Sequence, residues 1–444
     1  MESEFYRRNS LFRLIDTERN IVLESPNDLH NINTNDEVYD DEDLQFSPSM
    51  SSSPYITTML TLMPPPSPES PWTLSPHQTP SPSLLYQCIA SLYRPEGSIS
   101  SIAVSKQQGV VFAGSESTRI HVWRQPDHNE YGCLKATSGE VRAIAVHGNM
   151  LFTAHKDHKI RMWNFTVTDH IFKSKKVSSF PKTSSFTLFS RFTNTKQQHK
   201  ECISCLAYYQ TDGLVYTGSH DRTVKAWRLI TNHCVDSFVA HEDNVNAIVV
   251  NQDDGCVFTC SSDGSVKIWR RVFRENSHTL TMTLKSQFPN SHHPINAIAL
   301  NVSSNSCFLY SGSSDGTINF WEKEKLTHRF NHGGFLQGHH FSVMCLVAIE
   351  KLIFSGSEDT TIRVWRREEE GCFHECLAVL EGHRGPVRCL AACLEIDTVV
   401  KGFLVYSASL DQTFKVWRVK VSPEEGMWLN SHMDRRNNGI EDGM

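Results

Sequence analysis

Histidine, hydroxyl and carboxylate residues recur along this chain in an order that could support hydrolysis. In each of four segments a histidine is followed by a serine or threonine, then by an aspartate and finally by a tryptophan. The four sets are His199, Thr217, Asp221 and Trp227; His241, Thr259, Asp263 and Trp269; His339, Ser355, Asp359 and Trp365; and His383, Ser407, Asp411 and Trp417. A serine activated by a histidine that an aspartate orients is the nucleophile of many hydrolases.

The repetition of the set favours a structural role over catalysis. An enzyme needs one such constellation, whereas the same residue types occur here four times in the same order. A buried tryptophan needs an acceptor for its N–H group, and a buried hydroxyl can supply it. We therefore expect these side chains to stabilise a repeated fold, and we predict neither a catalytic residue nor a cofactor.

The elements that position these residues form a sevenfold repeat. Seven segments end in a tryptophan after a similar lead-in, and each predicts a strand, a tight turn and a second strand, with a further apolar strand upstream. The tryptophans are Trp123, Trp163, Trp227, Trp269, Trp321, Trp365 and Trp417. Their separations, from 40 residues (Trp123 to Trp163) to 64 (Trp163 to Trp227), fit four strands and loops of variable length.

The repeated pattern resembles that of the WD40 family over roughly residues 84 to 418. The resemblance implies an all-β, seven-bladed propeller, with four-stranded blades around a channel. It also implies that a strand before the first repeat, at Leu84 to Leu92, pairs with the last blade and closes the ring, which removes an exposed strand edge. In that family the four residue types form a buried hydrogen-bonded tetrad in each blade.

Three repeats carry an incomplete set. The second keeps Thr153, Asp157 and Trp163, but Thr137 stands where the histidine is expected. The fifth keeps Ser311, Asp315 and Trp321, while His292 and His293 are out of register. The first keeps only Trp123, so we expect its blade to be the least rigid.

Both ends of the chain differ in composition from the repeats. Residues 1–83 combine an acidic stretch with a Ser/Pro-rich tract, which predicts a disordered tail because too little apolar surface is available to offset chain entropy. Proline-directed kinases are expected partners of the tail, at Ser47, Ser53, Ser67, Ser70, Ser75, Thr79 and Ser81. Residues 84–419 form the propeller in this interpretation, and 420–444 form a C-terminal tail.

Composition and motifs argue against several other classes of protein. The formal net charge of −6 does not favour nucleic acid, and neither a signal peptide nor an apolar run of membrane-spanning length is found, so we expect a soluble, intracellular chain.

The 13 cysteines indicate free thiols. His199, Cys202 and Cys205 suggest zinc, but no second pair completes four ligands; Cys372 with Cys376 and Cys389 with Cys393 are interpreted in the same way. We predict no metal site.

An insertion after the second repeat, residues 165–198, is basic and rich in phenylalanine. With the adjoining Lys200, it carries Lys173, Lys175, Lys176, Lys182, Arg191 and Lys196 against Asp169 as its single acid. Such a segment suits an acidic peptide, a phosphorylated partner or RNA. Alternatively, part of it forms the outer strand of the second blade, and its lysines keep a loop soluble.

A candidate partner-binding rim follows from the repeat register. Residues just before the turn aspartates and near the starts of the inner strands should share one end of the ring, where arginine often contributes to binding hot spots. They are Arg142, Lys156, His220, Asn246, Asn296, Glu358, Arg388 and Leu410, with Ser262 and Ser314 beside them.

Arginine follows the tryptophan in five repeats, at Arg124, Arg228, Arg270, Arg366 and Arg418. Together with the lead-in SPSLLYQCIASLYRPEGSISSIAV and the position of the insertion, this pattern resembles plant WD40 proteins of the JINGUBANG type. The resemblance implies a regulatory protein of the cytoplasm and nucleus, acting in development or pollen germination through partners such as transcription factors.

The predicted function is therefore a non-enzymatic protein-interaction scaffold, as a monomeric ring that binds peptide segments or transcription regulators. One alternative is a substrate receptor of a cullin-type ubiquitin ligase, for which Trp321-Glu322 begins the expected motif but Glu324 occupies its basic position. A second alternative is RNA binding through residues 165–200.

Overall fold

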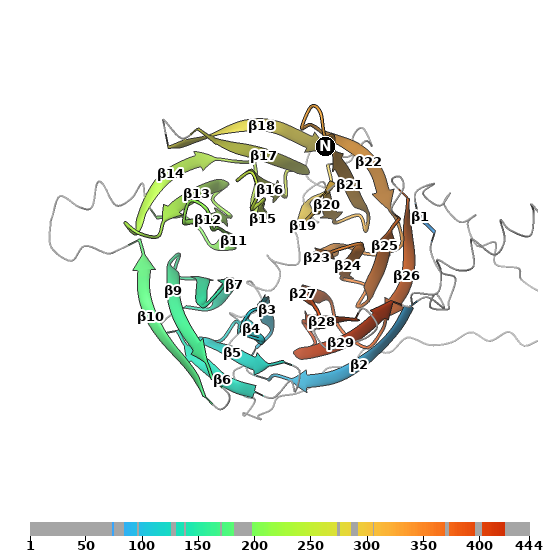
Figure 1. The fold of residues 1–444 in the computed structure, drawn as a ribbon, viewed down its shortest axis with the longest axis horizontal. Helices are drawn as coiled ribbons and strands as arrows, with labels where there is room; N and C mark the ends of the chain where they lie inside the picture. Colours follow the sequence, from blue (N-terminus) through green and yellow to red (C-terminus); the bar gives the residue numbers. More distant parts are fainter. Residues whose placement is uncertain are drawn as a thin grey trace, which may run out of the picture. The chain divides into compact units, whose positions relative to one another are not determined.

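The structure is a computed structural model that describes residues 73–74, 84–95, 97–125, 130–136, 139–168, 171–181, 198–272, 276–285, 292–304, 306–368, 373–395 and 402–421. These residues form seven sheets arranged in a ring (Figure 1). The predicted all-β, seven-bladed propeller is confirmed. The phosphorylation candidates and residues 422–444 lie outside the described ranges.

Each blade runs outward from an inner strand to an outermost strand. Blade 1 contains β3 (Ile99–Ser105), β4 (Val110–Ser115), β5 (Arg119–Arg124) and β6 (Glu130–Lys135). Blade 2 contains β7 (Val141–His147), β8 (Met150–His155), β9 (Ile160–Val167) and β10 (Phe172–Phe180). Blade 3 contains β11 (Ile203–Tyr209), β12 (Leu214–Ser219), β13 (Thr223–Arg228) and β14 (His233–Val239).

The remaining blades continue around the ring in chain order. Blade 4 contains β15 (Val245–Val250), β16 (Val257–Ser261), β17 (Ser265–Val272) and β18 (Ser277–Lys285). Blade 5 contains β19 (Ile295–Val302), β20 (Cys307–Ser313), β21 (Ile318–Lys323) and β22 (Phe330–Leu336). Blade 6 contains β23 (Val343–Ile349), β24 (Leu352–Ser357), β25 (Ile362–Arg367) and β26 (His374–Leu380), with β1 (Thr73–Leu74) parallel to β26.

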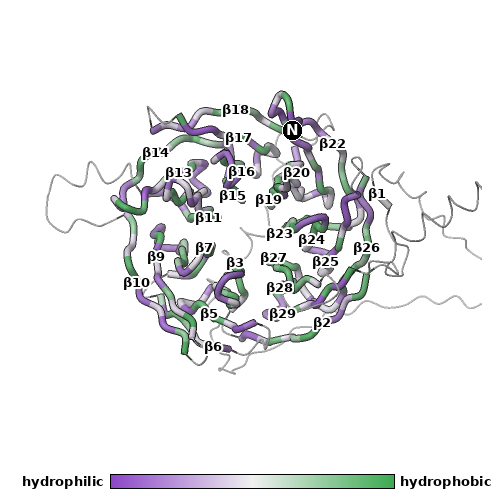
Figure 2. The backbone as a smooth tube through the Cα atoms, in the orientation of Figure 1, coloured by the Kyte–Doolittle hydropathy of each residue, from purple (hydrophilic) through white to green (hydrophobic). Residues whose placement is uncertain are grey.

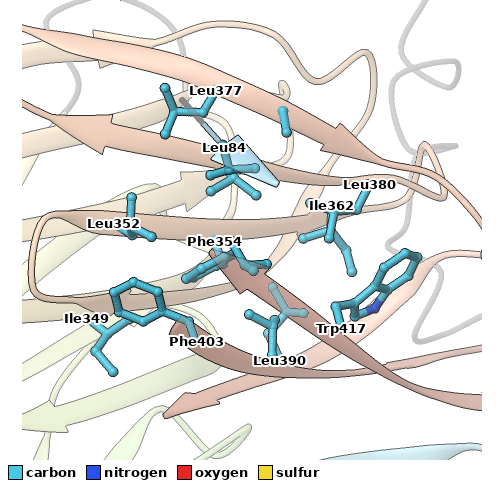
Figure 3. Packing of buried hydrophobic residues seen from close by; sticks show 14 of the residues in the cluster. Leu84, Ile349, Leu352, Phe354, Ile362, Leu377, Leu380, Leu390, Phe403 and Trp417 are labelled. Atoms are coloured by element: carbon cyan, nitrogen blue, oxygen red, sulfur yellow. The ribbon is translucent and has the colours of Figure 1, made fainter. Parts of the chain in front are cut away.

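Blade 7 joins the two ends of the propeller. Its inner strands β27 (Val387–Leu394), β28 (Gly402–Ser409) and β29 (Thr413–Val421) come from the C-terminal repeat, and β2 (Leu84–Tyr93) pairs antiparallel with β29. Leu84 is 2% exposed and lies with Leu377 and Leu380 in the core between blades 6 and 7 (Figure 3). The strand expected at Leu84 to Leu92 therefore closes the ring.

The apolar core is distributed between blades. Figure 2 shows hydrophobic segments in every blade around the ring, and the buried residues form seven clusters that each join strands of adjacent blades. Glycine near the end of a second strand permits this close packing. A Cβ atom on Gly218 would lie 2.6 Å from Cγ1 of Val245 in the next blade, too close for any side chain.

Part of the basic insertion is structural. Strand β10 begins within it and forms the outermost strand of blade 2, whereas residues 182–197 lie outside the described ranges. Over the part of the chain that the structure describes, there is no helix with the length and hydrophobicity needed to cross a membrane.

Candidate functional site

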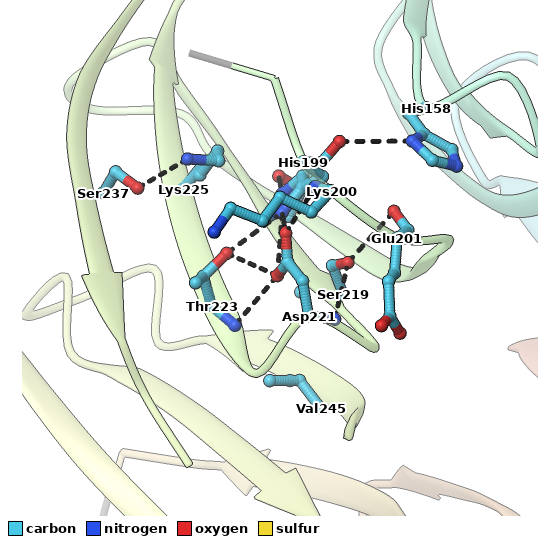
Figure 4. A network of polar contacts seen from close by, with 12 residues as sticks. His158, His199, Lys200, Glu201, Ser219, Asp221, Thr223, Lys225, Ser237 and Val245 are labelled. Carbon is cyan, nitrogen blue, oxygen red and sulfur yellow. Dashed lines mark hydrogen bonds and ion pairs between the residues drawn. The ribbon is translucent and has the colours of Figure 1, made fainter. Parts of the chain in front are cut away.

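The histidine–hydroxyl–aspartate sets come together as buried tetrads. Figure 4 shows one part of the blade 3 tetrad, His199 beside Asp221. His199 precedes the inner strand, and its Nδ1 lies 3.1 Å from Oδ2 of Asp221 in the β12–β13 turn. Its Nε2 lies 2.8 Å from Oγ1 of Thr217, which also accepts the indole N–H of Trp227 at 2.9 Å. The contacts are all satisfied when Nδ1–H donates to Asp221 and the threonine hydroxyl donates to Nε2.

The other three predicted sets repeat this geometry. In blade 4 the distances from His241 are 2.8 Å to Asp263 and 2.8 Å to Thr259, and Trp269 donates to Thr259 at 3.0 Å. In blade 6 the distances from His339 are 2.8 Å to Asp359 and 2.7 Å to Ser355, and Trp365 donates to Ser355 at 2.8 Å. In blade 7 His383 lies 3.3 Å from Asp411 and 2.7 Å from Ser407, and Trp417 donates to Ser407 at 2.8 Å.

The electrostatics of a tetrad favour a charged aspartate and a neutral histidine. Burial alone would raise the pKa of Asp359, but the hydrogen bond from His339, together with those from Thr361, brings that pKa well below its ordinary value. Burial lowers the pKa of His339 despite Asp359, and it lowers the pKa of His383 to about 4. In blades 6 and 7 the tetrad histidine is therefore neutral around neutral pH.

The tetrads are poorly suited to attack a substrate. The four hydroxyl residues, Thr217, Thr259, Ser355 and Ser407, are completely buried. Both ring nitrogens of each histidine already have partners inside the blade, as the distances above require. A nucleophile needs access to its substrate and a base that is free to take its proton. The geometry instead fits the structural role expected from the repetition.

Blade 2 obtains its histidine from a position that the sequence pattern did not indicate. His155 Nε2 lies 2.8 Å from Thr153 Oγ1, which also accepts from Trp163 at 3.0 Å. Asp157 pairs with Arg161 instead, at 2.6 Å. Thr137, where the histidine was expected, lies outside the described residues. The signal that could have revealed His155 is its place on the second strand of the blade, where the six other blades carry serine.

Blades 1 and 5 leave polar atoms unpaired. In blade 5, Ser311 Oγ is buried without a hydrogen bond to any described residue, and His292 and His293 are exposed. In blade 1, Ala113 replaces the hydroxyl residue, and Trp123 Nε1 is buried without a partner in the described chain. Its indole ring stacks on Phe414 of blade 7 at a centroid distance of 4.5 Å.

The eight predicted rim residues lie at one end of the blades, in turns between second and third strands or near the starts of inner strands. Several of these side chains form hydrogen bonds or an ion pair with the neighbouring blade. Asn246 Nδ2 donates to Ile295 O at 2.8 Å, and Asn296 Nδ2 donates to Val343 O at 3.1 Å. Arg388 bridges from blade 7 to Glu116 of blade 1 at 3.4 Å. These side chains hold neighbouring blades together, which limits what they can offer a partner.

Two further rim residues form a local charge cluster. Glu140 binds Arg142 at 3.1 Å and Lys156 at 3.3 Å. The Arg142 side chain is only 18% exposed, whereas that of Lys156 is 53% exposed. His220, Glu358 and Leu410 are half-buried in the turns before their aspartates. Lys156 is therefore the most accessible charge of the predicted set.

Sequence reasoning missed an exposed aromatic residue on the same end of the ring. Phe341 lies between β22 and β23, in the loop that also carries His339, and is 60% exposed. Its backbone carbonyl packs against the blade 5 turn at Gly316. The available sequence signal was a phenylalanine among polar residues, two positions before an inner strand. Exposed aromatic side chains are common anchors of protein interfaces.

The suspected zinc ligands are arranged for packing. His199 is held by Asp221 and Thr217, and Cys205 is buried in the core between blades 3 and 4. Burial raises the pKa of the Cys205 thiol to about 12, which disfavours the thiolate that zinc binds. Cysteines within the described ranges are free, and side chains there form no metal-binding group of three or more.

Comparison with known families agrees with the ring and its repeated tetrads. The family described as WD domain, G-beta repeat matches residues 86–124, 129–164, 190–228, 232–270, 282–322, 330–366 and 374–418, more than half of the chain. The chain belongs to the WD40 family. Each match lacks the outermost strand of its own blade; the first, for example, contains most of β2, from blade 7, with β3, β4 and β5 of blade 1.

Two curated proteins are similar to part of this chain. Mitochondrial division protein 1 of Schizosaccharomyces pombe is 26% identical over 139 residues, which are 31% of this chain and 21% of that protein. Human Kinesin-like protein KIF21A is 28% identical over 185 residues, 38% of this chain and 10% of that protein. The chain thus spans about a fifth and a tenth of these relatives' lengths. WD40 propellers typically serve as non-enzymatic scaffolds for protein interactions.

Proposed function

We propose that this chain is a non-enzymatic scaffold that captures protein segments at one face of the ring. We call it the tetrad face; it is defined by Lys156, His220, Phe341 and Glu358. The observation that carries the proposal is that the tetrad side chains hydrogen-bond to one another inside the blades. Their histidines and hydroxyls are therefore not placed to react with a substrate. Binding then falls to exposed side chains around them, and Phe341 is the large apolar group among these.

We further propose a plant regulatory role of the JINGUBANG type, in the cytoplasm and nucleus, with transcription regulators among the partners. The arginine after five of the repeat tryptophans supports this, as does the insertion between Trp163 and Trp227. Proline-directed kinases acting on the Ser/Pro-rich tail would add a layer of control. Pollen germination or another developmental process is the setting that the resemblance favours.

Capture from pollen extract tests the proposal. The immobilised full chain is compared with Phe341→Ser and with Leu326→Ser, and retained proteins are identified by mass spectrometry. Leu326 is the matched control because it is 90% exposed and lies in the β21–β22 turn, at the opposite end of β22 from Phe341. We expect a set of proteins, including transcription regulators, to be lost with Phe341→Ser and kept with Leu326→Ser.

Other outcomes would redirect the assignment. Equal retention by both variants would place the binding surface away from the tetrad face. A captured set dominated by subunits of a cullin-type ligase would favour the ubiquitin-ligase alternative, and a set that disappears after ribonuclease treatment would favour RNA. A fluorescent fusion that is excluded from the nucleus would contradict the proposed location.

A further inference from the structure

Strand β10 carries the densest run of like charge among the outermost strands. Lys173, Lys175 and Lys176 are all exposed, and none forms an ion pair with a described residue. Val177, in the β-bulge after Lys176, is 54% exposed, and Ile171 just before the strand is 51% exposed. We call Lys173, Lys175, Lys176 and Val177 the β10 strip.

The strip lines a shallow groove of about 460 Å³ along β9 and β10. Lys173 is paired in register with Thr166, and Lys175 with Asn164, so these two lysines share one face of the sheet with neutral polar side chains. The groove has no carboxylate among its lining residues. An anion on that face therefore meets Lys173 and Lys175 without a competing internal acid, while Lys176 extends from the other face of the same strand.

Protection of a strand edge is not a sufficient explanation for the lysines. Lysine on an edge strand does discourage pairing with other chains. However, the other six outermost strands, β2, β6, β14, β18, β22 and β26, carry at most one lysine each. Four of them, β2, β14, β22 and β26, carry no lysine and at most one acid. Strand β10 also lies outside every matched WD40 repeat, since the matches stop at residue 164 and resume at 190. The charge run is a property of this chain, not of its repeat.

We propose that the β10 strip binds an acidic, extended segment of a partner protein. The outer edge of β10 is unpaired within the described chain and offers backbone N–H and C=O groups to an added strand, as in β-augmentation. The lysines select carboxylates or phosphates, and Val177 supplies an apolar contact beside them. This inference rests on the proposed scaffold function and adds a second surface, with a defined ligand chemistry, on the side of blade 2.

The described strip fits a peptide better than RNA. Single-stranded nucleic acid is held by exposed aromatic rings on which bases stack. Here Phe165 is 1% exposed, and Phe172 packs against Phe112 at a centroid distance of 6.1 Å. Both aromatic rings next to the lysines therefore belong to the core between blades 1 and 2.

The test is fluorescence anisotropy with a labelled octaglutamate peptide on the full-length protein. The variant Lys173→Glu/Lys175→Glu/Lys176→Glu is compared with the control Lys135→Glu/Lys285→Glu/Lys325→Glu, which changes three exposed lysines elsewhere by the same charge. We expect binding by the wild type and the control, and a roughly tenfold loss in the strip variant, because three exposed ion pairs disappear. Binding should also weaken as salt rises from about 0.01 to 0.15 M.

Several results would overturn the inference. Absence of octaglutamate binding by the wild type, unchanged binding by the strip variant, or an equal loss in the control would each do so. Tighter binding of an oligouridylate RNA, lost in the strip variant, would assign the strip to nucleic acid instead. An octaglutamine peptide measures any charge-independent binding, and thermal unfolding verifies that both variants fold. Failure here leaves capture at Phe341 untouched, so the two proposals are separable.

Discussion

His155 Nε2 lies 2.8 Å from Thr153 Oγ1, only two residues away on the same strand. In four other blades the equivalent partner of the hydroxyl is a histidine from the loop before the inner strand. The position of His155 is there occupied by serine, whose hydroxyl accepts the backbone N–H of the turn aspartate, as Ser219 does from Asp221 at 3.1 Å. Blade 2 thus keeps the buried acceptor of its tryptophan while changing the source of the imidazole.

This exchange predicts an acid-sensitive blade. Burial lowers the pKa of His155 to about 4 in the folded chain, whereas the unfolded chain has the ordinary histidine pKa of about 6.5. Between these two pH values the unfolded chain binds a proton that the folded chain does not. Stability from this group is full above about pH 6.5 and is lost as the pH falls toward 4. The free energy of unfolding should fall between pH 7 and pH 5 in the wild type. In His155→Asn this fall should be smaller by roughly 1–2 kcal/mol, because the titrating group is absent. Urea denaturation at both pH values measures this change, with His233→Asn, at an exposed position, as the matched control.

The histidine–aspartate bond can be isolated by comparing two blades. Asp359 and Asp315 each accept the backbone N–H of a threonine two residues later, at 3.0 and 2.9 Å, but only Asp359 also binds a histidine. Asp359→Ala should lower the free energy of unfolding by about 1–3 kcal/mol more than Asp315→Ala, because it leaves a buried imidazole N–H unpaired. Equal denaturation midpoints for the two variants would argue against a structural tetrad and would reopen a catalytic interpretation.

Ring closure depends on β2, and truncation tests it. Deletion of residues 1–78 retains the whole of β2, whereas deletion of 1–95 removes it and exposes the edge of β29. We expect the shorter deletion to unfold near the wild-type midpoint and the longer one to unfold at a clearly lower temperature. Similar cooperative transitions for both truncations, followed by circular dichroism, would contradict this assignment.

A pair of adjacent leucines gives the same test without truncation. Leu84 is 2% exposed between blades 6 and 7, whereas Leu85 is 69% exposed. Leu84→Ala should cost about 2–4 kcal/mol through lost burial and the remaining cavity. Leu85→Ala should change the urea midpoint very little, and a comparable cost at both positions would mean that β2 does not pack as described.

The rim combines structural and accessible charges, and substitution should separate them. Arg388 is paired with Glu116 across the junction of blades 7 and 1, with side chains 11% and 16% exposed. Arg388→Glu would place two carboxylates together and should lower the free energy of unfolding by about 1–3 kcal/mol. Lys156→Glu breaks a pair with Glu140 in which the lysine is 53% exposed, and it should cost less, below about 1 kcal/mol. A loss of partner binding in Arg388→Glu could therefore reflect lost stability, so Phe341→Ser is the better test of binding. An unchanged denaturation midpoint for Arg388→Glu would show that Arg388 is not needed for stability and would make it a suitable binding test as well.

Local sequence determined much of the architecture. The seven tryptophans, the turn aspartates and the alternation of apolar residues predict strands and turns because they depend on near neighbours in the chain. The position of the closing strand, Leu84 to Leu92, could be expected as well, since a ring must pair its last edge. Four complete tetrads were therefore identified residue by residue, although the repeat resemblance was needed to assign their contacts.

The tertiary structure decided the features that depend on how loops and neighbouring blades meet. His155 replaces a loop histidine because distance in space, not register, selects the partner of Thr153. Asn296 and Arg388 form contacts between blades because the neighbouring blade lies next to the start of their strands. Phe341 is exposed because the loop between blades 5 and 6 carries it at the end of the ring. The same applies to Lys173 and its neighbours, whose exposure follows from the place of β10 at the outer edge of blade 2. Side-chain pattern along the chain specifies a strand and its two faces, but only packing assigns each face to core, neighbour or solvent.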